Sequence, residues 1–405
     1  MILSISWRNI WRNKTRSFVV ITAVALGICA GVFSTAFMKG MMDQRTQSAI
    51  STEISHIQIH RQNYRQENSL QLYMNESMAV VEQIKKINHV KGVSQRIIIQ
   101  SMIASAETSS GVKIAGIYPE NEKMVTNLST KLVEGKYFKG VPKNPVVIGQ
   151  KLADKLNVKL HSKIVITLQD MDNNITAGAY RIAGIFKTSN SNYDEMSVFV
   201  RYDDLSRLLA LPEGASHEIA IFVDDNEMVD IIQNKVKEFI PDYEILNWKE
   251  ISPELSYLTE IMDMYMYIFI IIILLALLFG IINTMLMVIL ERRKEIGMLM
   301  AVGMNKIKVF TLILVETVQL SLVGGVVGVF AGGLISAYFE THAINMSMFA
   351  EGLSKIGWDS MVYCSVEIDM ILNVTIMVII AGIIASVYPA YKALKYDPAE
   401  ALRME

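Results

Sequence analysis

Five consecutive charged side chains stand between two long apolar segments of the sequence. They read ERRKE, from Glu291 to Glu295, and methionines and glycines follow them. Charges of both signs can form charge-assisted hydrogen bonds with a groove on another protein, and apolar side chains at helical spacing can pack beside them. A solvated turn would need only the positive residues. The predicted contact residues are Glu291, Arg292, Arg293, Lys294, Glu295, Ile296, Leu299, Met300 and Gly303.

The sequence contains no recognisable catalytic or cofactor-binding motif. It has no G-x-x-x-x-G-K-[ST] phosphate loop, no G-x-S-x-G elbow and no HExxH pair, and its six histidines are scattered. The two cysteines, Cys29 and Cys364, are too few for a cysteine-based metal site. We therefore expect a chain that is not an enzyme and that itself binds no metal or cofactor.

One acidic residue, Glu316, falls inside a long apolar segment. An intramembrane carboxylate is costly and must face protein or water. A proton relay is one interpretation, but the apolar segments offer no second acidic residue or histidine as its partner. The sequence favours a structural hydrogen bond with Gln319 or Asn283.

The apolar segments that position these residues are long enough to cross a membrane. The 405-residue chain is 52% hydrophobic and 19% charged, which is typical of membrane proteins. About 20 residues cross about 30 Å of hydrocarbon, and four segments reach that length, at 17–38, 264–290, 309–339 and 370–391. The formal net charge of −2 gives no basic field for binding nucleic acid.

Basic residues predict the orientation of the chain. Lys and Arg gather near the N-terminus, after residue 290 and in the tail, whereas the stretch before the last apolar segment holds a single lysine among several acids. We therefore expect both termini in the cytoplasm. The predicted cytoplasmic segments are 1–16, 291–305 and 392–405, and the predicted outer segments are 39–263 and 340–369.

Residues 1–16 have the pattern of an interfacial helix. Trp7, Ile10 and Trp11 follow an i, i+3, i+4 spacing, while arginines recur at every fourth residue from Arg8. Like charges so spaced repel one another, and anionic lipid phosphates would relieve that repulsion. A nucleic-acid arm and a simple orientation signal are the alternatives.

Small residues recur at four-residue intervals in two of the apolar segments. One series runs from Ala23 to Thr35 and the other from Gly324 to Ser336. Such ridges let helices pack closely in lipid. The sequence does not distinguish packing within the chain from packing against a second copy.

The outer segment 39–263 has the pattern of an α+β domain, with room for two modest subdomains. Apolar and β-branched runs predict strands near 56–60, 96–104, 112–118, 145–149, 163–168, 180–186, 197–200 and 218–223. Helical patterns fall near 76–88, 149–157, 202–210 and 226–239. The predicted fold class is an α-helical membrane protein with four transmembrane helices and a large α+β extracytoplasmic domain inserted between the first and the second.

Three motifs suggest a family. They are WRNIWRNKTRS at 7–17, ERRKEIGMLMAVGM at 291–304 and YPAYKALKYDPAEALR at 388–403, and HIQIH at 56–60 and VVIGQKLADKLNV at 146–158 accompany them. With these motifs in this order, the chain resembles the FtsX-like ABC-transporter permeases over nearly its whole length. It looks like the lipoprotein-releasing LolC/LolE type, with a MacB-like topology.

The resemblance implies a bacterial inner-membrane protein in which 291–305 is a coupling helix lying against a cytoplasmic ABC ATPase. The ATPase would use ATP and Mg, and the permease would pair with a second copy or a paralogue. The implied function is mechanical release of lipoproteins from the outer leaflet to a periplasmic carrier or adaptor. Drug or peptide efflux of the MacB type, and FtsX-like regulation of cell-wall hydrolases without transport, are the alternatives.

Methionines gather at the predicted outer ends of the first two membrane segments. Their flexible, polarizable side chains tolerate variable apolar ligands such as acyl chains, although they also serve as packing filler. The candidate lipid-binding residues are Phe37, Met38, Met41, Met42, Met264, Met266, Phe269, Ile270 and Ile273.

Overall fold

The computed structural model describes residues 2–12 and 14–394. Most of the predicted cytoplasmic tail therefore lies outside the described residues. The described chain divides into two compact units. We call the first the helical unit, which comprises the residues up to Asp43, Thr259–Asn345 and those from Met361 onward. The second, the α+β unit, comprises Gln44–Leu258 and Met346–Ser360.

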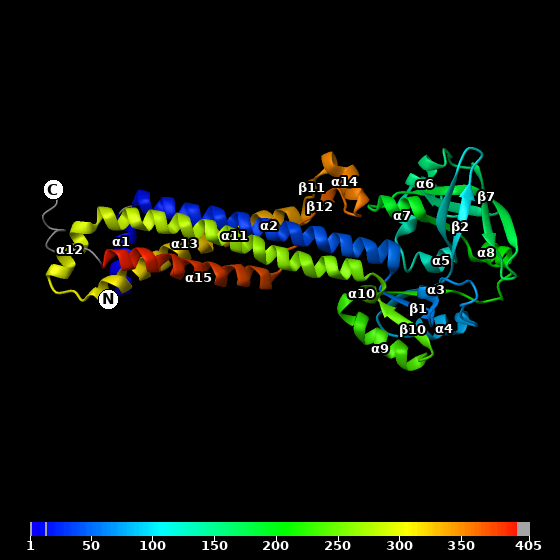
Figure 1. Cartoon of the computed structure of the whole chain (residues 1–405), viewed down its shortest axis with the longest axis horizontal. Helices are drawn as coiled ribbons and strands as arrows, with labels where there is room; N and C mark the ends of the chain where they lie inside the picture. The colour runs from blue at the N-terminus through cyan, green and yellow to red at the C-terminus, as the bar shows by residue number, and fades with distance from the viewer. Residues whose placement is uncertain (1, 13, 395–405) are drawn as a thin grey trace. The chain divides into compact units, whose positions relative to one another are not determined.

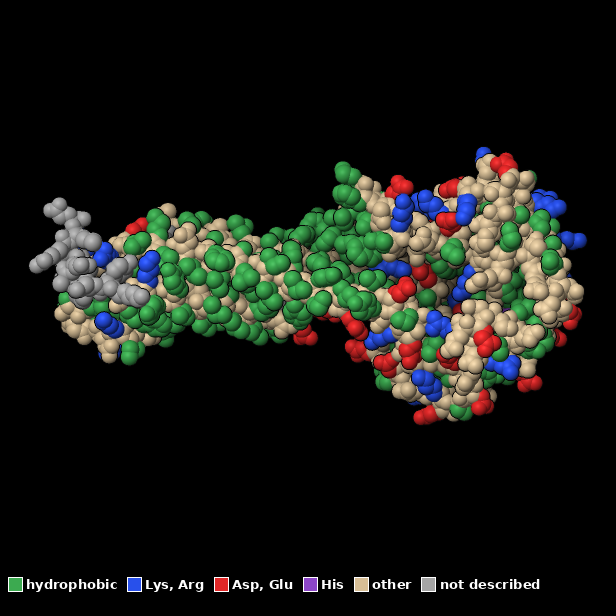
Figure 2. All heavy atoms as spheres, viewed as in Figure 1, with side chains coloured by type: hydrophobic (Ala, Val, Ile, Leu, Met, Phe, Trp, Pro, Cys, Tyr) green, Lys and Arg blue, Asp and Glu red, His purple; other side chains and the backbone are tan. Residues whose placement is uncertain are grey.

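Four helices among the described residues are long and apolar enough to cross a membrane, as predicted. They are α2 (Lys14–Ser48), α11 (Pro253–Glu291), α13 (Lys306–Thr341) and α15 (Ile368–Ala393) (Figure 1). Hydrophobic side chains cover most of the face of these helices seen in Figure 2. The 39 residues of α11 correspond to about 58 Å, well beyond the about 30 Å of a hydrocarbon core. This helix is therefore much longer than its predicted membrane segment.

Both small-residue ridges pack within the chain. A Cβ atom added at Gly27 or Gly31 of α2 would meet Leu277 or Ile273 of α11. On α13, a Cβ at Gly328 would lie 2.7 Å from the carbonyl oxygen of Ala25 on α2. Close backbone approach through glycines is how these helices associate, so the chain supplies its own partner for each ridge.

Two shorter helices complete one end of the helical unit. The first, α1 (Ile2–Arg12), packs on α13, where Ser6 and Ile10 are buried and the Ser6 hydroxyl donates to the Leu312 carbonyl at 3.4 Å. The second, α12 (Arg293–Ala301), follows α11 after a break at Arg292. The short strands β11 (Ile344–Asn345) and β12 (Met361–Val362) pair antiparallel between α13 and α15.

A ten-stranded sheet organises the described α+β unit, with nine strands in the order β10-β1-β9-β2-β3-β8-β5-β7-β4 and β6 paired with β2 and β7. All eight predicted strands are present, but β4 and β10 were not predicted. The bounds are β1 (Ile57–Arg61), β2 (Val90–Ala104), β3 (Ser109–Ile117), β4 (Leu132–Gly135), β5 (Pro145–Gly149), β6 (Lys163–Gln169), β7 (Ile175–Phe186), β8 (Ser197–Arg201), β9 (Glu218–Val223) and β10 (Tyr243–Asn247).

Short helices flank this sheet. They are α3 (Tyr64–Glu67), α4 (Ser77–Ile84), α5 (Pro119–Glu122), α6 (Gln150–Lys155), α7 (Ser191–Met196), α8 (Tyr202–Leu209), α9 (Val229–Phe239), α10 (Trp248–Ile251) and α14 (Ala350–Lys355). A π-helix, Ala49–Ile54, and the 3-10 turns Leu128–Thr130, Asn226–Met228 and Ser347–Phe349 complete the unit.

The α+β unit has separate apolar cores on one continuous sheet. One large core surrounds β5, β6 and β7, and another lies between β1, β9 and helices α4 and α9. Arg96 of β2 is buried and forms hydrogen bonds to Glu122 and Glu218, which are also buried. Because the sheet runs through both cores, the two predicted subdomains are one compact unit.

Candidate functional site

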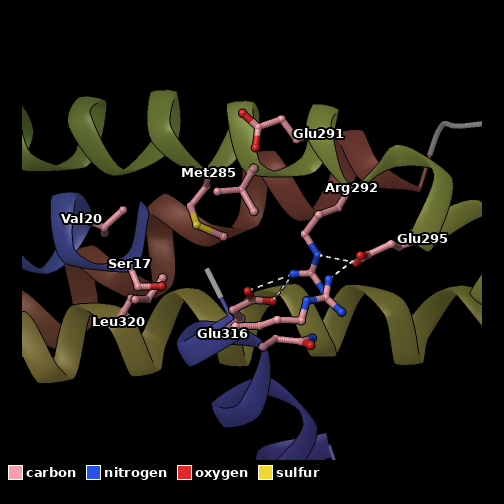
Figure 3. Close-up of a pocket in the computed structure, with 11 residues that line it drawn as sticks. Ser17, Val20, Met285, Glu291, Arg292, Glu295, Glu316 and Leu320 are labelled. Carbon is pink, nitrogen blue, oxygen red and sulfur yellow. Dashed lines mark hydrogen bonds and ion pairs between the residues drawn. The ribbon is translucent and has the colours of Figure 1, made fainter. Parts of the chain in front are cut away.

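Arg292 links three helices at the start of the charged segment. It is the N-cap of α12, with φ −93° and ψ 14°, so α11 and α12 are not one continuous helix. Its Nη1 donates to both carboxylate oxygens of Glu316 on α13, each at 2.9 Å, and its Nε donates to Oε2 of Glu295 at 3.0 Å (Figure 3). The arginine side chain is 17% exposed and that of Glu316 is 7% exposed.

The network continues to the N-terminal helix. Arg12 of α1 forms an ion pair with Oε1 of Glu295, the oxygen that Arg292 does not use. The hydrogen bond from Arg12 has the largest effect on the pKa of Glu295 and, together with Arg292, holds it below its ordinary value, although burial of the carboxylate opposes this. Burial opposes the charge of Arg292, but Glu316 and Glu295 outweigh it and raise its pKa. Both groups therefore stay ionised and paired.

A cavity of about 280 Å³ lies beside this network. Figure 3 shows the side chains that line it, which come from α1, α2, α11, the start of α12 and α13. Its polar wall holds two arginines and three carboxylates, and its apolar wall holds Val20, Met285 and Leu320. A shift of α12 must therefore change contacts with several helices at once.

The predicted partner of Glu316 was wrong. The structure pairs this carboxylate with Arg292, whereas Gln319 donates to the Leu3 carbonyl at 3.4 Å. The carboxylate and the guanidinium are 24 positions apart in sequence, and only the break after α11 turns the arginine back toward α13. The sequence did offer a signal for this pairing: an arginine just after one apolar segment and a single acidic residue within the next one.

The predicted contact segment has an inward and an outward side. Arg292 and Glu295 belong to the ion-pair network, Ile296 is 5% exposed and lies in the apolar core, and Leu299 and Met300 are partly buried beside it. The apolar stripe that was expected to face a partner therefore packs against the helices of this chain. Arg293 is half-buried.

The outward side of the segment around α12 holds two of the predicted contact residues and two residues that were not predicted. Glu291 and Lys294 are exposed, as are Met298, at 53%, and Val302, at 85%. Gly303 has φ +97°, which favours glycine, and no atom lies within 4 Å of the position of a Cβ there. Gly303 thus directly follows the C-cap of α12, Val302, and its predicted close packing against a partner stays a prediction.

The candidate lipid-binding residues differ in exposure. Met264 is 52% and Phe269 is 38% exposed, whereas Met42 and Ile270 are buried at 3% and 5%. Met42 and Ile270 are therefore packing residues and cannot line an open mouth in this structure. The remaining candidates, Phe37, Met38, Met41, Met266 and Ile273, are partly buried.

Three histidines of the α+β unit are buried and hydrogen-bonded. His56 Nε2 contacts Asn226 Oδ1 at 2.7 Å, His60 Nδ1 contacts the His217 carbonyl at 3.1 Å, and His217 Nε2 contacts the Leu70 carbonyl at 3.0 Å. Burial lowers the pKa of each imidazole. No group of three His, Cys, Asp or Glu side chains in the described chain could hold a metal ion.

Two family models match the sequence. The FtsX-like permease C-terminal family matches residues 267–398, and the MacB-like periplasmic core domain matches residues 17–239.

Curated relatives match the chain at low identity. An uncharacterized ABC transporter permease of Methanocaldococcus jannaschii is 24% identical over 100% of this chain and 98% of its own length. The lipoprotein-releasing system transmembrane protein LolC of Buchnera aphidicola is 25% identical over 99% of this chain and 98% of its own length. The macrolide export ATP-binding/permease protein MacB of Chlorobium luteolum is 34% identical over 43% of this chain and 24% of its own length.

Two solved structures are similar to part of the chain. The extracellular domain of the transporter YknZ from Gram-positive bacteria covers 47% of this chain and 99% of its own, with 14% identity and a TM-score of 0.33. The periplasmic region of MacB from Actinobacillus actinomycetemcomitans covers 53% of this chain and 98% of its own, with 12% identity and a TM-score of 0.36.

Proposed function

This chain belongs to the ABC-transporter permeases that have a MacB-like periplasmic core domain and an FtsX-like C-terminal region, and we propose that it works as the mechanical subunit of an ATP-driven transporter. The sequence has no phosphate loop, so a separate cytoplasmic ABC ATPase would bind ATP and Mg. The permease would lie in the bacterial inner membrane with both termini in the cytoplasm, paired with a second copy or a paralogue.

The observation that carries this proposal is the Arg292–Glu316 ion pair. It ties the start of α12 to α13, with both N–O distances at 2.9 Å. An ATPase that presses on the outward side of α12, at Lys294, Met298 and Val302, would therefore displace α13 as well. The transfer is a rigid-body movement of packed helices and requires no covalent chemistry in this chain.

Release of lipoproteins is the transport reaction that we favour. LolC, named as a transmembrane protein of a lipoprotein-releasing system, matches 99% of this chain and 98% of its own length, whereas MacB matches over only 24% of its own length. Exposed Met264 and Phe269 offer apolar surface for an acyl chain. The lipoprotein would leave the outer leaflet and pass to a periplasmic carrier. Efflux is the second candidate, because the MacB-like core domain matches residues 17–239.

Site-specific photo-crosslinking in native membranes tests the substrate. A photoreactive residue replaces Met264 in one variant and, as a control, Val326 of α13, which is 68% exposed. Capture of an acylated protein at position 264 but not at 326 would support lipoprotein release. Capture of phospholipid alone at both positions would contradict it, and capture of an efflux adaptor would favour the second candidate.

A further inference from the structure

One flank of α1 exposes an apolar stripe. Leu3, Trp7 and Trp11 are four residues apart, which places them on the same side of a helix, and they are 66%, 44% and 46% exposed. The two indole rings pack edge to face with centroids 5.8 Å apart. The face toward α13 is formed instead by Ser6 and Ile10, which are buried. The tryptophan flank therefore lies at the surface of the described unit.

A positive charge next to this stripe is not neutralised by the described chain. Arg8 is exposed and has no ion pair or hydrogen bond with any described residue. Arg12, one turn later, differs from Arg8 because it forms an ion pair with the carboxylate of Glu295. Because no described carboxylate pairs with Arg8, its guanidinium is available to bind an anion from outside the chain.

The position of α1 in the chain identifies the source of that anion. Helix α2, which contains the first membrane span, begins at Lys14, directly after α1. Tryptophan rings prefer the headgroup level of a bilayer, and helices with an exposed apolar flank and basic residues lie in that interface. A protein partner would need a complementary acidic groove at the same level, whereas the bilayer is already present there.

We propose that α1 binds the headgroup of an anionic phospholipid, with the phosphate at Arg8 and the rings of Trp7 and Trp11 between headgroup and acyl chains. The site reaches the ion-pair network, because α1 also carries Arg12 and forms one wall of the cavity beside Arg292. A bound lipid would hold that wall, and with it Glu295, in place. This last consequence depends on the proposed function, whereas lipid binding itself does not.

Tryptophan quenching by brominated lipids tests the site in the full chain. The protein is reconstituted in two series of phosphatidylcholine vesicles, one with increasing fractions of brominated phosphatidylglycerol and the other with increasing fractions of brominated phosphatidylcholine. Emission from a W7F/W11F variant gives the contribution of Trp248 and Trp358 and is subtracted. We expect brominated phosphatidylglycerol to quench the fluorescence of Trp7 and Trp11 at a lipid fraction about fivefold lower than brominated phosphatidylcholine requires. This factor corresponds to about 1 kcal/mol, the contribution of one basic residue at an anionic surface.

Two matched variants locate the effect. Arg8→Gln should remove the preference for phosphatidylglycerol while quenching by phosphatidylcholine remains, because the tryptophans still lie in the interface. Lys308→Gln, which removes an exposed charge near the start of α13, should keep the preference. Absence of quenching by either lipid, equal quenching by both, or a preference that persists in Arg8→Gln would each overturn the proposal. None of these readings depends on an ATPase or on a transport substrate.

Discussion

Both carboxylate oxygens of Glu316 lie 2.9 Å from Nη1 of Arg292, across the break between α11 and α12. The two side chains are mostly buried, and separating two buried charges is strongly unfavourable. A displacement at the start of α12 must therefore either carry α13 with it or break this pair.

Removing one partner of the pair should destabilise the helical unit. Arg292→Ala leaves the carboxylate of Glu316 buried and unpaired, which costs about 3–5 kcal/mol. The double variant Arg292→Met/Glu316→Met buries no charge and should be much closer to the wild-type protein. The measurement is the melting temperature of the purified chain. A single variant as stable as the wild type would show that the carboxylate has another partner.

Substitutions on the outward side of α12 should lower the amount of ATPase that co-purifies with this chain. Lys294→Glu and Met298→Asp change exposed side chains and should lower the amount of co-purified ATPase by about tenfold, which corresponds to about 1.4 kcal/mol. Lys392→Glu reverses an exposed charge on α15 and should leave recovery unchanged. Equal recovery in all variants would argue that the ATPase binds elsewhere.

Close helix packing should make one glycine far more sensitive than another on the same helix. At Gly328 a Cβ atom would lie 2.7 Å from a backbone oxygen of α2, whereas at Gly333 nothing lies within 4 Å. Gly328→Ala should therefore cost about 1–3 kcal/mol through overpacking. Gly333→Ala should be neutral or slightly stabilising, because alanine favours the helix. Thermal unfolding of the two variants compares them, and equal melting temperatures would contradict the packing of α13 on α2.

Acid should destabilise the α+β unit through its buried histidines. Burial lowers the folded-state pKa of His56, His60 and His217 below the ordinary 6.5. The unfolded chain then binds more protons below about pH 6.5, so stability is greatest above that pH and falls as the pH drops toward the folded-state pKa values. Melting temperatures measured at about pH 8 and about pH 5.5, on either side of the ordinary value, test this.

A pair of histidine variants separates this effect from general acid sensitivity. His60→Gln removes one buried imidazole and should flatten the dependence of melting temperature on pH. His161→Gln removes an exposed one and should leave the dependence as it is. If both variants follow the wild-type profile, other groups determine the acid sensitivity.

Periodicity and length were sufficient to predict the four long helices and eight of the strands. They failed for β4 and β10, which lie at the two ends of the strand order and do not show the alternation of buried and exposed side chains that marks a half-buried strand. For the charged segment, the helical spacing of Ile296, Leu299 and Met300 correctly indicated one apolar face. Spacing alone does not show whether such a face packs against a partner or against the chain's own helices. In this structure Ile296 packs in the chain's own apolar core.

Because α11 is long and uninterrupted, a small tilt at one end of this helix produces a large displacement at its other end. Its 39 residues contain no proline after the first position, so the helix can pivot as a single rod of about 58 Å. A tilt of about 5° at one end would carry the other end through about 5 Å, a distance comparable to one helical turn. A small rotation of α11 at its Glu291 end would thus be enough to move its Pro253 end by several ångströms.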